Sequence, residues 1–230
     1  MPRPRRRRKN ASASRRAATF CRRLIIFAKS PVAGRVKTRL GRQTGIGCAT
    51  RFARQSAAAL LARVAYDGRW QTTIAISPDA ICAGRFWPLG IRQRSQGSGD
   101  LGRRMQRVME QMPPGPVVIV GTDIPALRPA HIAKAFSCIG RHDAVFGPAR
   151  DGGYWLVGLR RRPRVVRAFG GVRWSSAYAL ADTLANIEGL RIAYLATLSD
   201  VDDARDLAAS RGGFGRRVLP CGNPDLSPLP

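Results

Sequence analysis

The stretch Leu24–Leu40 reads LIIFAKSPVAGRVKTRL and decides the fold. Its first five residues are apolar, and so short a run predicts a buried strand rather than a helix. A proline and a glycine then mark a loop, which delivers Arg35, Lys37 and Arg39 within five residues. A strand, a basic glycine-containing loop and a helix are typical of phosphate binding at the carboxyl edge of an open α/β sheet. The alternative interpretation is a basic surface turn in an arginine-rich protein.

The remainder of the foldable chain alternates apolar runs with helical periodicity. Further strands are expected at 71–77, 116–121, 143–148, 154–159 and 191–195, and helices at 45–66, 100–112, 129–139, 175–187 and 203–210. Such alternation predicts an α/β fold with a single doubly wound, mostly parallel sheet and helices on both faces. Two adjacent strands around Gly152 and Gly153 predict one local departure from parallel order. Residues 85–98 are expected to be irregular.

The charge is strongly basic but unevenly distributed. Forty basic against 14 acidic residues give a net charge of +26, which usually indicates nucleic acid or a membrane surface as partner. Ten of the basic residues and no acid lie in residues 1–23, which predicts a disordered basic arm. We interpret the arm as an idle extension or an early start, with a nucleic-acid tail or an organelle-targeting peptide as alternatives. Residues 24–210 form the predicted domain, and residues 211–230 a loose Gly/Pro-rich tail.

The cysteines and the apolar runs of the sequence indicate the cellular compartment in which the protein is expected. The five cysteines are odd in number and widely spaced, with no C-x-x-C, which argues against a disulfide framework or a zinc site and for a reducing compartment. No apolar run approaches the roughly 18 residues that a membrane span needs. The N-terminus also lacks the apolar core of a secretory signal. A cytoplasmic protein without a membrane span is therefore expected.

An acidic residue follows the clearest central strand directly, in the sequence Gly121-Thr122-Asp123-Ile124-Pro125. Open α/β sheets bind ligands at the carboxyl ends of their strands, and a carboxylate there suits Mg²⁺ or Mn²⁺ bridging two phosphates. The alternative is a helix N-cap. The next helix is expected to begin only near Pro129, so Asp123 fits the metal role better.

A second acidic cluster, Asp200-Val201-Asp202-Asp203, follows the last strand. If the segment is extended, Asp200 and Asp202 share a face and would complete a metal site begun by Asp123. The alternative is an N-cap for the final helix, which suits Asp203 best.

Two glycine-containing loops are further candidates. Residues 151–155 (DGGYW) combine an acid, flexible backbone and two aromatic rings, a combination that suits the approach of a sugar; a tight hairpin is the compatible structural alternative. Residues 96–102 (QGSGDLG) enter a helix, and Ser98 or Asp100 would serve there as a helix cap. The two histidines are isolated and are expected to be structural or exposed.

Six blocks together resemble a known family. They are FAKSPVAGRVKTRLG, QGSGDLGRRM, GTDIPAL, GPARDGGYWLVGL, VRWSSAYAL and DVDDARDL. In this order they resemble the bacterial glycosyltransferase-like family associated with radical-SAM proteins and arsenosugar biosynthesis. That family belongs to the nucleotide-diphospho-sugar transferase superfamily, so the resemblance implies a GT-A type fold over residues 24–208.

The resemblance also implies roles for single residues. Arg35, Lys37 and Arg39 would contact the nucleotide phosphates. Other positions fall into three groups: Gln96, Gly97 and Asp100 toward the nucleotide base; Asp123 and Asp202 toward the metal; Gly152, Gly153, Tyr154, Trp174 and Ser175 toward the acceptor. Asp151 is the candidate base, and Asp123 and Lys37 complete the expected catalytic set.

Three functions remain open on the sequence. The first is a Mg²⁺- or Mn²⁺-dependent glycosyltransferase that takes a nucleotide-sugar donor and a small-molecule acceptor. The second is a nucleotidyltransferase on the same fold, which joins a nucleoside triphosphate to a phosphorylated small molecule and releases pyrophosphate. The third is a nucleic-acid-binding module led by the basic arm, although such binding is expected to be non-specific and driven by counterion release.

Overall fold

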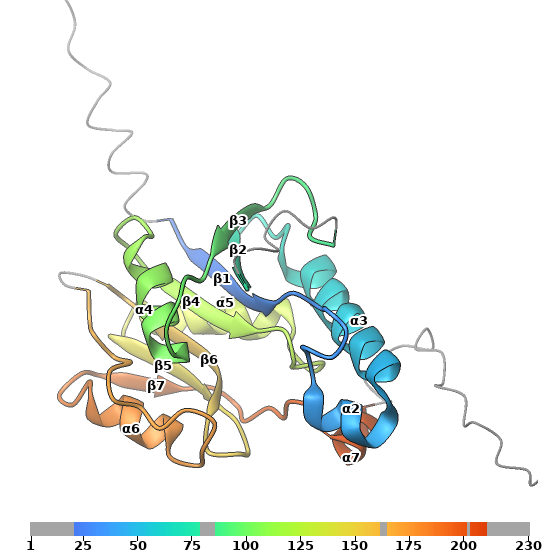
Figure 1. The fold of residues 1–230 in the computed structure, drawn as a ribbon. Coiled ribbons are helices and arrows are strands. Elements are labelled where there is room, and N and C mark those ends of the chain that lie inside the picture. The colour runs from blue at the N-terminus through green and yellow to red at the C-terminus, as the bar shows by residue number, and fades with distance from the viewer. Residues whose placement is uncertain (1–20, 79–85, 162–164, 202, 211–230) are drawn as a thin grey trace, which may run out of the picture.

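The computed structural model (Figure 1) describes residues 21–78, 86–161, 165–201 and 203–210. Their strands are β1 (Arg23–Lys29), β2 (Gln71–Ser77), β3 (Arg92–Ser95), β4 (Val117–Gly121), β5 (Ala144–Pro148), β6 (Tyr154–Leu159) and β7 (Ile192–Tyr194). They form one seven-stranded sheet in the order β3-β2-β1-β4-β6-β5-β7. All neighbouring strands are parallel except that β6 runs antiparallel to both β4 and β5. The predicted fold class and the predicted local departure from parallel order are therefore confirmed.

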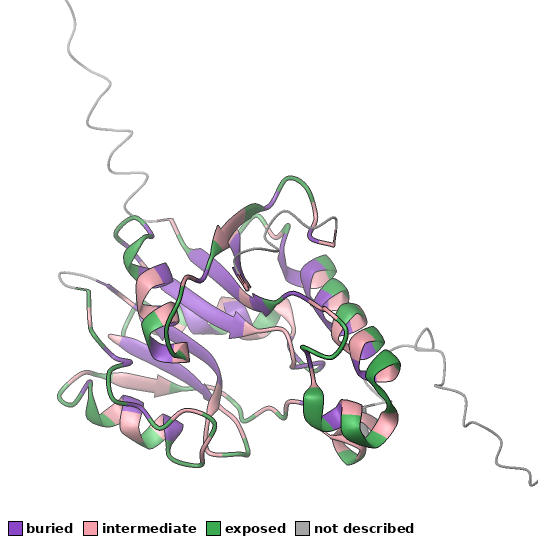
Figure 2. Cartoon of the chain, in the orientation of Figure 1, coloured by how far each residue is buried: buried purple, intermediate pink, exposed green. Residues whose placement is uncertain are grey.

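Helices cover both faces of this sheet (Figure 1). They are α2 (Thr38–Thr44), α3 (Ile46–Val64), α4 (Leu101–Glu110), α5 (Pro129–Ile139), α6 (Ala179–Ala185) and α7 (Ala204–Ser210). Because side chains alternate along a strand, Leu24 and Ile26 of β1 pack with α3 and α5, whereas Ile25 packs with α4. The central strands are consequently buried on both faces, as Figure 2 shows.

The long helix α3 begins and ends close to its predicted bounds because its apolar side chains recur every four residues. Phe52, Ser56, Leu60 and Val64 are all buried, as the periodicity predicts. Ser56 is polar, and its hydroxyl donates to the Thr122 carbonyl at 2.8 Å. That bond satisfies a buried hydroxyl and fixes the chain at the end of β4.

Two short elements were not predicted. The edge strand β3 reads RQRS and has no apolar residue, so only its backbone pairing with β2 defines it. The helix α2 buries a single residue, Leu40, and begins after a residue in the left-handed conformation. Conversely, the helix expected from residue 175 begins only at Ala179, because Ser175 has a φ of 58° that no α-helix accommodates.

Several expectations concern the ends of the chain. The strand β1 begins at Arg23, one residue before the predicted domain boundary, and the Arg23 side chain donates to the Cys21 carbonyl at 2.9 Å. Residues 1–20 of the predicted basic arm and the whole predicted tail, residues 211–230, lie outside the described residues. The final helix α7 ends at Ser210, the last described residue, and the predicted domain bounds stay a prediction.

Cysteine chemistry differs in part from expectation. Cys21 and Cys138 are free thiols, whereas Cys48 in α3 is disulfide-bonded, although the spacing of the cysteines favours none. No helix in the described ranges is long and apolar enough to cross a membrane.

Candidate active site

The basic loop and the acid of the central strand meet. Lys37 Nζ lies 2.9 Å from Asp123 Oδ2 in an ion pair. The Lys37 side chain is only 7% exposed, whereas that of Asp123 is 46% exposed. Lys37 adopts the left-handed conformation, with φ 47° and ψ 49°, which is uncommon for a residue other than glycine. The loop therefore turns Lys37 inward toward Asp123.

The sheet explains why these two residues meet. β1 and β4 are parallel neighbours, and Phe27 near the end of β1 is paired with Gly121 at the end of β4. Both strands therefore end at the same edge, where an open α/β sheet binds ligands. Arg35 and Arg39, the other two predicted phosphate-binding residues, lie on either side of Lys37 and are exposed.

The segment after β7 brings a second carboxylate to this edge. The Val201 N–H donates to the Asp123 carbonyl at 3.3 Å, and the Val201 side chain is buried with Leu40 and Phe52 between α2 and α3. Asp200 precedes it and lines the same cavity as Asp123. Asp202, the predicted second metal ligand, lies outside the described residues. Asp203 accepts hydrogen bonds from the Arg205 and Asp206 backbone N–H groups, so it caps α7 as expected.

A cavity of about 410 Å³ opens beside Asp123 on the α4 and α6 side of the sheet. It unites most residues that the sequence assigns to metal and acceptor, namely Asp123, Asp151, Gly153, Tyr154, Trp174 and Ser175. Its volume falls in the range of ordinary small-molecule sites. These residues line one cavity, and their chemical roles stay predictions.

The Asp151 loop has the expected tight geometry. Asp151 Oδ1 accepts a hydrogen bond from the Gly153 N–H at 2.9 Å. Gly152 has a φ of 83° and packs against the Ala177 backbone, where a Cβ atom would clash. Only glycine meets both conditions, so Gly152 serves the turn and the contact with residues 176–178 rather than presenting a group to the cavity.

Aromatic residues form one wall of the cavity. The Tyr154 and Trp174 rings meet edge to face with centroids 6.4 Å apart. The Tyr154 hydroxyl lies 3.3 Å from Thr183 Oγ1 in a hydrogen bond. Burial raises the pKa of the Tyr154 phenol above its ordinary value, so this residue stays protonated and is no candidate base.

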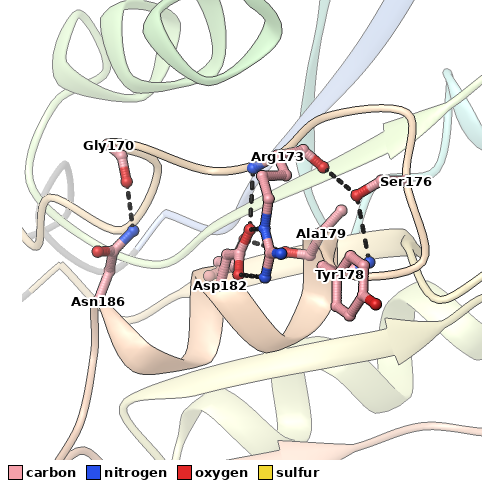
Figure 3. A network of polar contacts seen from close by, with 8 residues as sticks. Gly170, Arg173, Ser176, Tyr178, Ala179, Asp182 and Asn186 are labelled. Atoms are coloured by element: carbon pink, nitrogen blue, oxygen red, sulfur yellow. Dashed lines mark hydrogen bonds and ion pairs between the residues drawn. The ribbon is translucent and has the colours of Figure 1, made fainter.

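A polar network holds the loop that carries Trp174 and Ser175 (Figure 3). Arg173 pairs with Asp182 of α6 through two side-chain bonds of 2.9 and 2.7 Å, and its backbone N–H donates to the same carboxylate at 2.9 Å. Asn186 donates to the Gly170 carbonyl at 2.7 Å. The Ser176 hydroxyl donates to the Arg173 carbonyl at 2.6 Å. The loop is therefore joined to α6 through Arg173 and to Asn186, the residue that follows α6, through Gly170.

The predicted base-binding loop lies beside β2 and β3, outside this cavity. Gln96 is 2% exposed, and its side-chain amide donates to the Ala28 and Ala75 carbonyls at 3.0 and 2.8 Å. Its side-chain oxygen accepts from Arg104 at 2.8 Å. In this arrangement Gln96 supports the ends of β1 and β2 rather than presenting its amide to a ligand.

The neighbours of Gln96 in this loop also have structural partners. Asp100 caps α4 by accepting from the Arg103 N–H at 2.7 Å, as the alternative interpretation predicts. Gly97 has a φ of 73° and packs against the Arg107 side chain. Sequence reasoning did not single out Arg104, which lies in the first turn of α4 and donates to Ser77 Oγ at the end of β2, 3.5 Å away. The one sequence feature that could have indicated Arg104 is its place in the block QGSGDLGRRM.

The residues at the cavity mouth are suited to a divalent ion. Asp123 and Asp200 line one cavity and offer carboxylate oxygens, the ligands that Mg²⁺ and Mn²⁺ prefer. Within the described ranges no group of three or more His, Cys, Asp or Glu side chains is arranged to hold a metal ion. Such an ion would therefore need oxygen ligands from elsewhere, such as substrate phosphates.

Comparisons with known proteins agree with this architecture. The profile of a bacterial protein family described as "Uncharacterized protein conserved in bacteria (DUF2064)" matches residues 60–176. A search among curated proteins finds no match. Among solved structures, a Desulfovibrio desulfuricans G20 protein provisionally assigned as a nucleotide-diphospho-sugar transferase has a TM-score of 0.77 and 28% identity, over 85% of this chain and 89% of that one.

Two more distant structures share the fold. The 4-diphosphocytidyl-2C-methyl-D-erythritol synthase of Anaerococcus prevotii DSM 20548 has a TM-score of 0.55 and 10% identity, over 84% of this chain and 98% of that one. A CMP:2-keto-3-deoxy-manno-octonic acid synthetase in complex with CTP has a TM-score of 0.50 and 13% identity, over 84% and 97% of the two chains. At such identities the likeness shows the fold alone. None of these comparisons bears on radical-SAM proteins or arsenosugars, so that association stays a prediction.

Proposed function

Because the chain belongs to the DUF2064 family of bacterial proteins and has the fold of nucleotide-diphospho-sugar transferases, we propose that it is a metal-dependent glycosyltransferase with a nucleotide-sugar donor. The observation that carries the proposal is the 2.9 Å contact between Lys37 and Asp123. A cation and a metal-binding carboxylate at one strand edge are what a diphosphate with its divalent ion requires.

On the donor side, the loop after β1 supplies positive charge. Lys37, with Arg35 and Arg39 beside it, would contact the phosphates and stabilise the negative charge that develops on the leaving nucleoside diphosphate. Arg104, near the ends of β2 and β3, is a further cation on this side. Asp123 and Asp200 would hold Mg²⁺ or Mn²⁺, which supplies Lewis-acid stabilisation of the diphosphate when bound.

On the acceptor side, Asp151 is the candidate general base. Its Oδ1 is oriented by the Gly153 N–H, which leaves Oδ2 to take the proton of an acceptor hydroxyl as the new glycosidic bond forms. Tyr154 and Trp174 would contact the flat apolar face of the acceptor. The loop of residues 170–178 positions that wall.

The test is nucleotide binding with and without Mn²⁺. A panel of nucleoside diphosphates, nucleotide sugars and nucleoside triphosphates is screened by thermal shift, because a ligand that binds only the folded protein raises its melting temperature. The proposal expects a shift that requires Mn²⁺ and is lost in Asp123→Asn. Glu188→Gln removes an exposed carboxylate outside the cavity and serves as the matched control. An unchanged, Mn²⁺-independent shift in Asp123→Asn would remove the metal assignment.

Nucleotidyl transfer is the second candidate, since two proteins that share the fold are nucleotide-sugar or nucleotide-alcohol synthetases by name. The basic loop would suit a triphosphate equally well. Product analysis separates the two reactions: release of a nucleoside diphosphate supports glycosyl transfer, and release of pyrophosphate from a nucleoside triphosphate supports nucleotidyl transfer.

A further inference from the structure

The cavity beside Asp123 has an unusual charge for this protein. The chain carries 40 Lys and Arg residues, yet no Lys, Arg or His is among the described residues that line the cavity. Its charged lining consists of three carboxylates, Asp123, Asp151 and Asp200. Lys37 forms an ion pair with Asp123 from the loop after β1, and Lys37 is not among the residues that line the cavity.

Most of the remaining lining is apolar or aromatic, and Ser175 and Ser176 add hydroxyl groups. The apolar and aromatic lining includes Phe27, Leu101, Met105, Ile119, Tyr154 and Trp174. Met105 and Ile119 are buried in the core, and the other four side chains are partly buried and pack against it. Together they form the apolar surface that we call the floor of the cavity. A ligand in this cavity would therefore place an apolar face on the floor and its polar groups toward the carboxylates.

This distribution separates two classes of ligand. A phosphorylated ligand is normally recognised by arginine, lysine or a group of backbone N–H donors. Here no such cation lines the cavity among the described residues, and the phosphate would face the carboxylate of Asp151, whose like charge repels it. A divalent ion held by Asp123 and Asp200 would be shared with the donor diphosphate, and it would leave the charge of Asp151 uncompensated.

We propose that the acceptor is an alcohol or amine that carries no phosphate, is uncharged or cationic, and presents an apolar face to the floor of the cavity. This inference rests on the proposed transferase function, which makes the bound alcohol or amine an acceptor. The predicted selectivity for the charge of the ligand follows from the lining of the cavity. It argues against nucleotidyl transfer to a phosphorylated substrate at this site. Ser175, exposed at the rim, would be a hydroxyl partner for such an acceptor.

The experiment compares three probes that share one glycoside and differ in the group at C6, which is neutral, cationic or anionic. Phenyl β-D-glucoside, its 6-amino-6-deoxy derivative and its 6-phosphate are titrated into the full-length protein by ligand-observed NMR at one ionic strength. The uncharged and cationic probes are expected to bind at least about tenfold more tightly than the phosphate. Equal or tighter binding of the phosphate overturns the proposal, and so does the absence of binding by both other probes.

A variant shows whether the selectivity comes from the cavity. Asp151→Asn keeps the size of the side chain and the oxygen that accepts from Gly153, but removes one negative charge. It should improve the binding of the phosphate probe relative to the uncharged one by about threefold or more, whereas Glu188→Gln should leave this ratio unchanged. The same ratio in Asp151→Asn as in the wild type overturns the assignment of the selectivity to the cavity.

Failure of the proposed function is detected separately. Nucleoside diphosphates with Mn²⁺ are titrated in parallel, without any glycoside. Binding of the uncharged and cationic probes without nucleotide binding would overturn the proposed function and still support the ligand class. Nucleotide binding with a preference for the phosphate probe would support the transferase and overturn the inference about its acceptor.

Discussion

Lys37 and Asp123 form an ion pair 2.9 Å long at the edge where β1 and β4 end. The two groups come from different strand-and-loop units, and only the parallel pairing of β1 with β4 brings them together. In the protein without ligand each charge is compensated by the other. A diphosphate with its divalent ion would offer an anion to Lys37 and a cation to Asp123, so both charges would keep a partner.

Replacement of Lys37 tests this exchange. Lys37→Met keeps the length of the side chain but removes its charge, and we expect nucleotide diphosphate affinity to fall by roughly 10- to 100-fold, because a hydrogen bond to a charged group contributes about 1.5–3 kcal/mol. The free energy of unfolding should change by no more than about 1 kcal/mol, since Asp123 is half exposed and the pair is screened by solvent. Calorimetric titration and urea unfolding measure the two effects.

Lys134→Met is the control for Lys37→Met, because Lys134 is an exposed lysine on α5. It should leave nucleotide affinity unchanged. If Lys37→Met binds nucleotide diphosphates as the wild type does, Lys37 has no role in phosphate binding.

The Arg173–Asp182 pair gives a prediction for the loop of residues 170–178. Arg173→Lys keeps the charge but loses the two parallel bonds to Asp182. We expect faster chymotrypsin cleavage after Trp174 and Tyr178 and a lower melting temperature, with nucleotide binding unchanged. Arg51→Lys, at an exposed position on α3, is the control. Unchanged cleavage would show that the pair does not hold the loop.

The Arg173–Asp182 ion pair is expected to persist over a defined pH range. The side-chain hydrogen bonds from Arg173 lower the pKa of Asp182 to about 2, from 3.8. A carboxyl group whose pKa is lower in the folded protein stabilises the fold at pH values above its pKa in the unfolded chain. This stabilisation is lost as the pH falls through its pKa in the folded protein. Chymotrypsin sensitivity of the loop, after correction for the pH dependence of the protease, should therefore stay constant down to about pH 4.

The sequence predicted β4 and β6, which are apolar on both faces, because burial leaves a signal in every residue: β6 has the bounds expected, and β4 begins one residue later. It missed β3 and α2, whose positions depend on backbone pairing and on one buried leucine. Strand ends located Asp123 and Asp151. The assignment of Gln96 to base recognition illustrates the limit, because the direction of a side chain is set by partners such as Arg104 that a linear sequence does not reveal.

Gly152 provides a test of the contact between the Asp151 loop and residues 176–178. Gly152→Ala must adopt φ 83° and also displace the Ala177 backbone. Gly171→Ala has a similar φ of 65° but open space around its Cβ. We expect Gly171→Ala to cost about 1–2 kcal/mol of unfolding free energy, and Gly152→Ala about 1–3 kcal/mol more because of overpacking. Equal losses in urea unfolding would mean that the Ala177 contact adjusts freely.

His131 makes the stability of the protein depend on pH. Its Nδ1 accepts a hydrogen bond from the Arg128 N–H at 3.1 Å, at the start of α5, and this bond requires the neutral ring. Burial, and secondarily the Arg128 guanidinium, lower the pKa of His131 below 6.5. Below pH 6.5 the unfolded chain therefore binds more protons at this residue than the folded protein does. The contribution of His131 to the free energy of unfolding is thus fully present above pH 6.5. It is lost as the pH falls through the pKa that His131 has in the folded protein.

His131→Gln should remove this pH dependence, because glutamine does not titrate. The difference in unfolding free energy between the wild type and His131→Gln is measured by urea unfolding between about pH 5 and about pH 8. It should shift steadily in favour of the variant as the pH falls below 6.5. Lys134→Met, which changes an exposed residue of the same helix, should retain the wild-type slope. A His131→Gln slope equal to that of the wild type would show that the folded protein accommodates the charged ring, and would contradict the assignment of the neutral ring to the α5 cap.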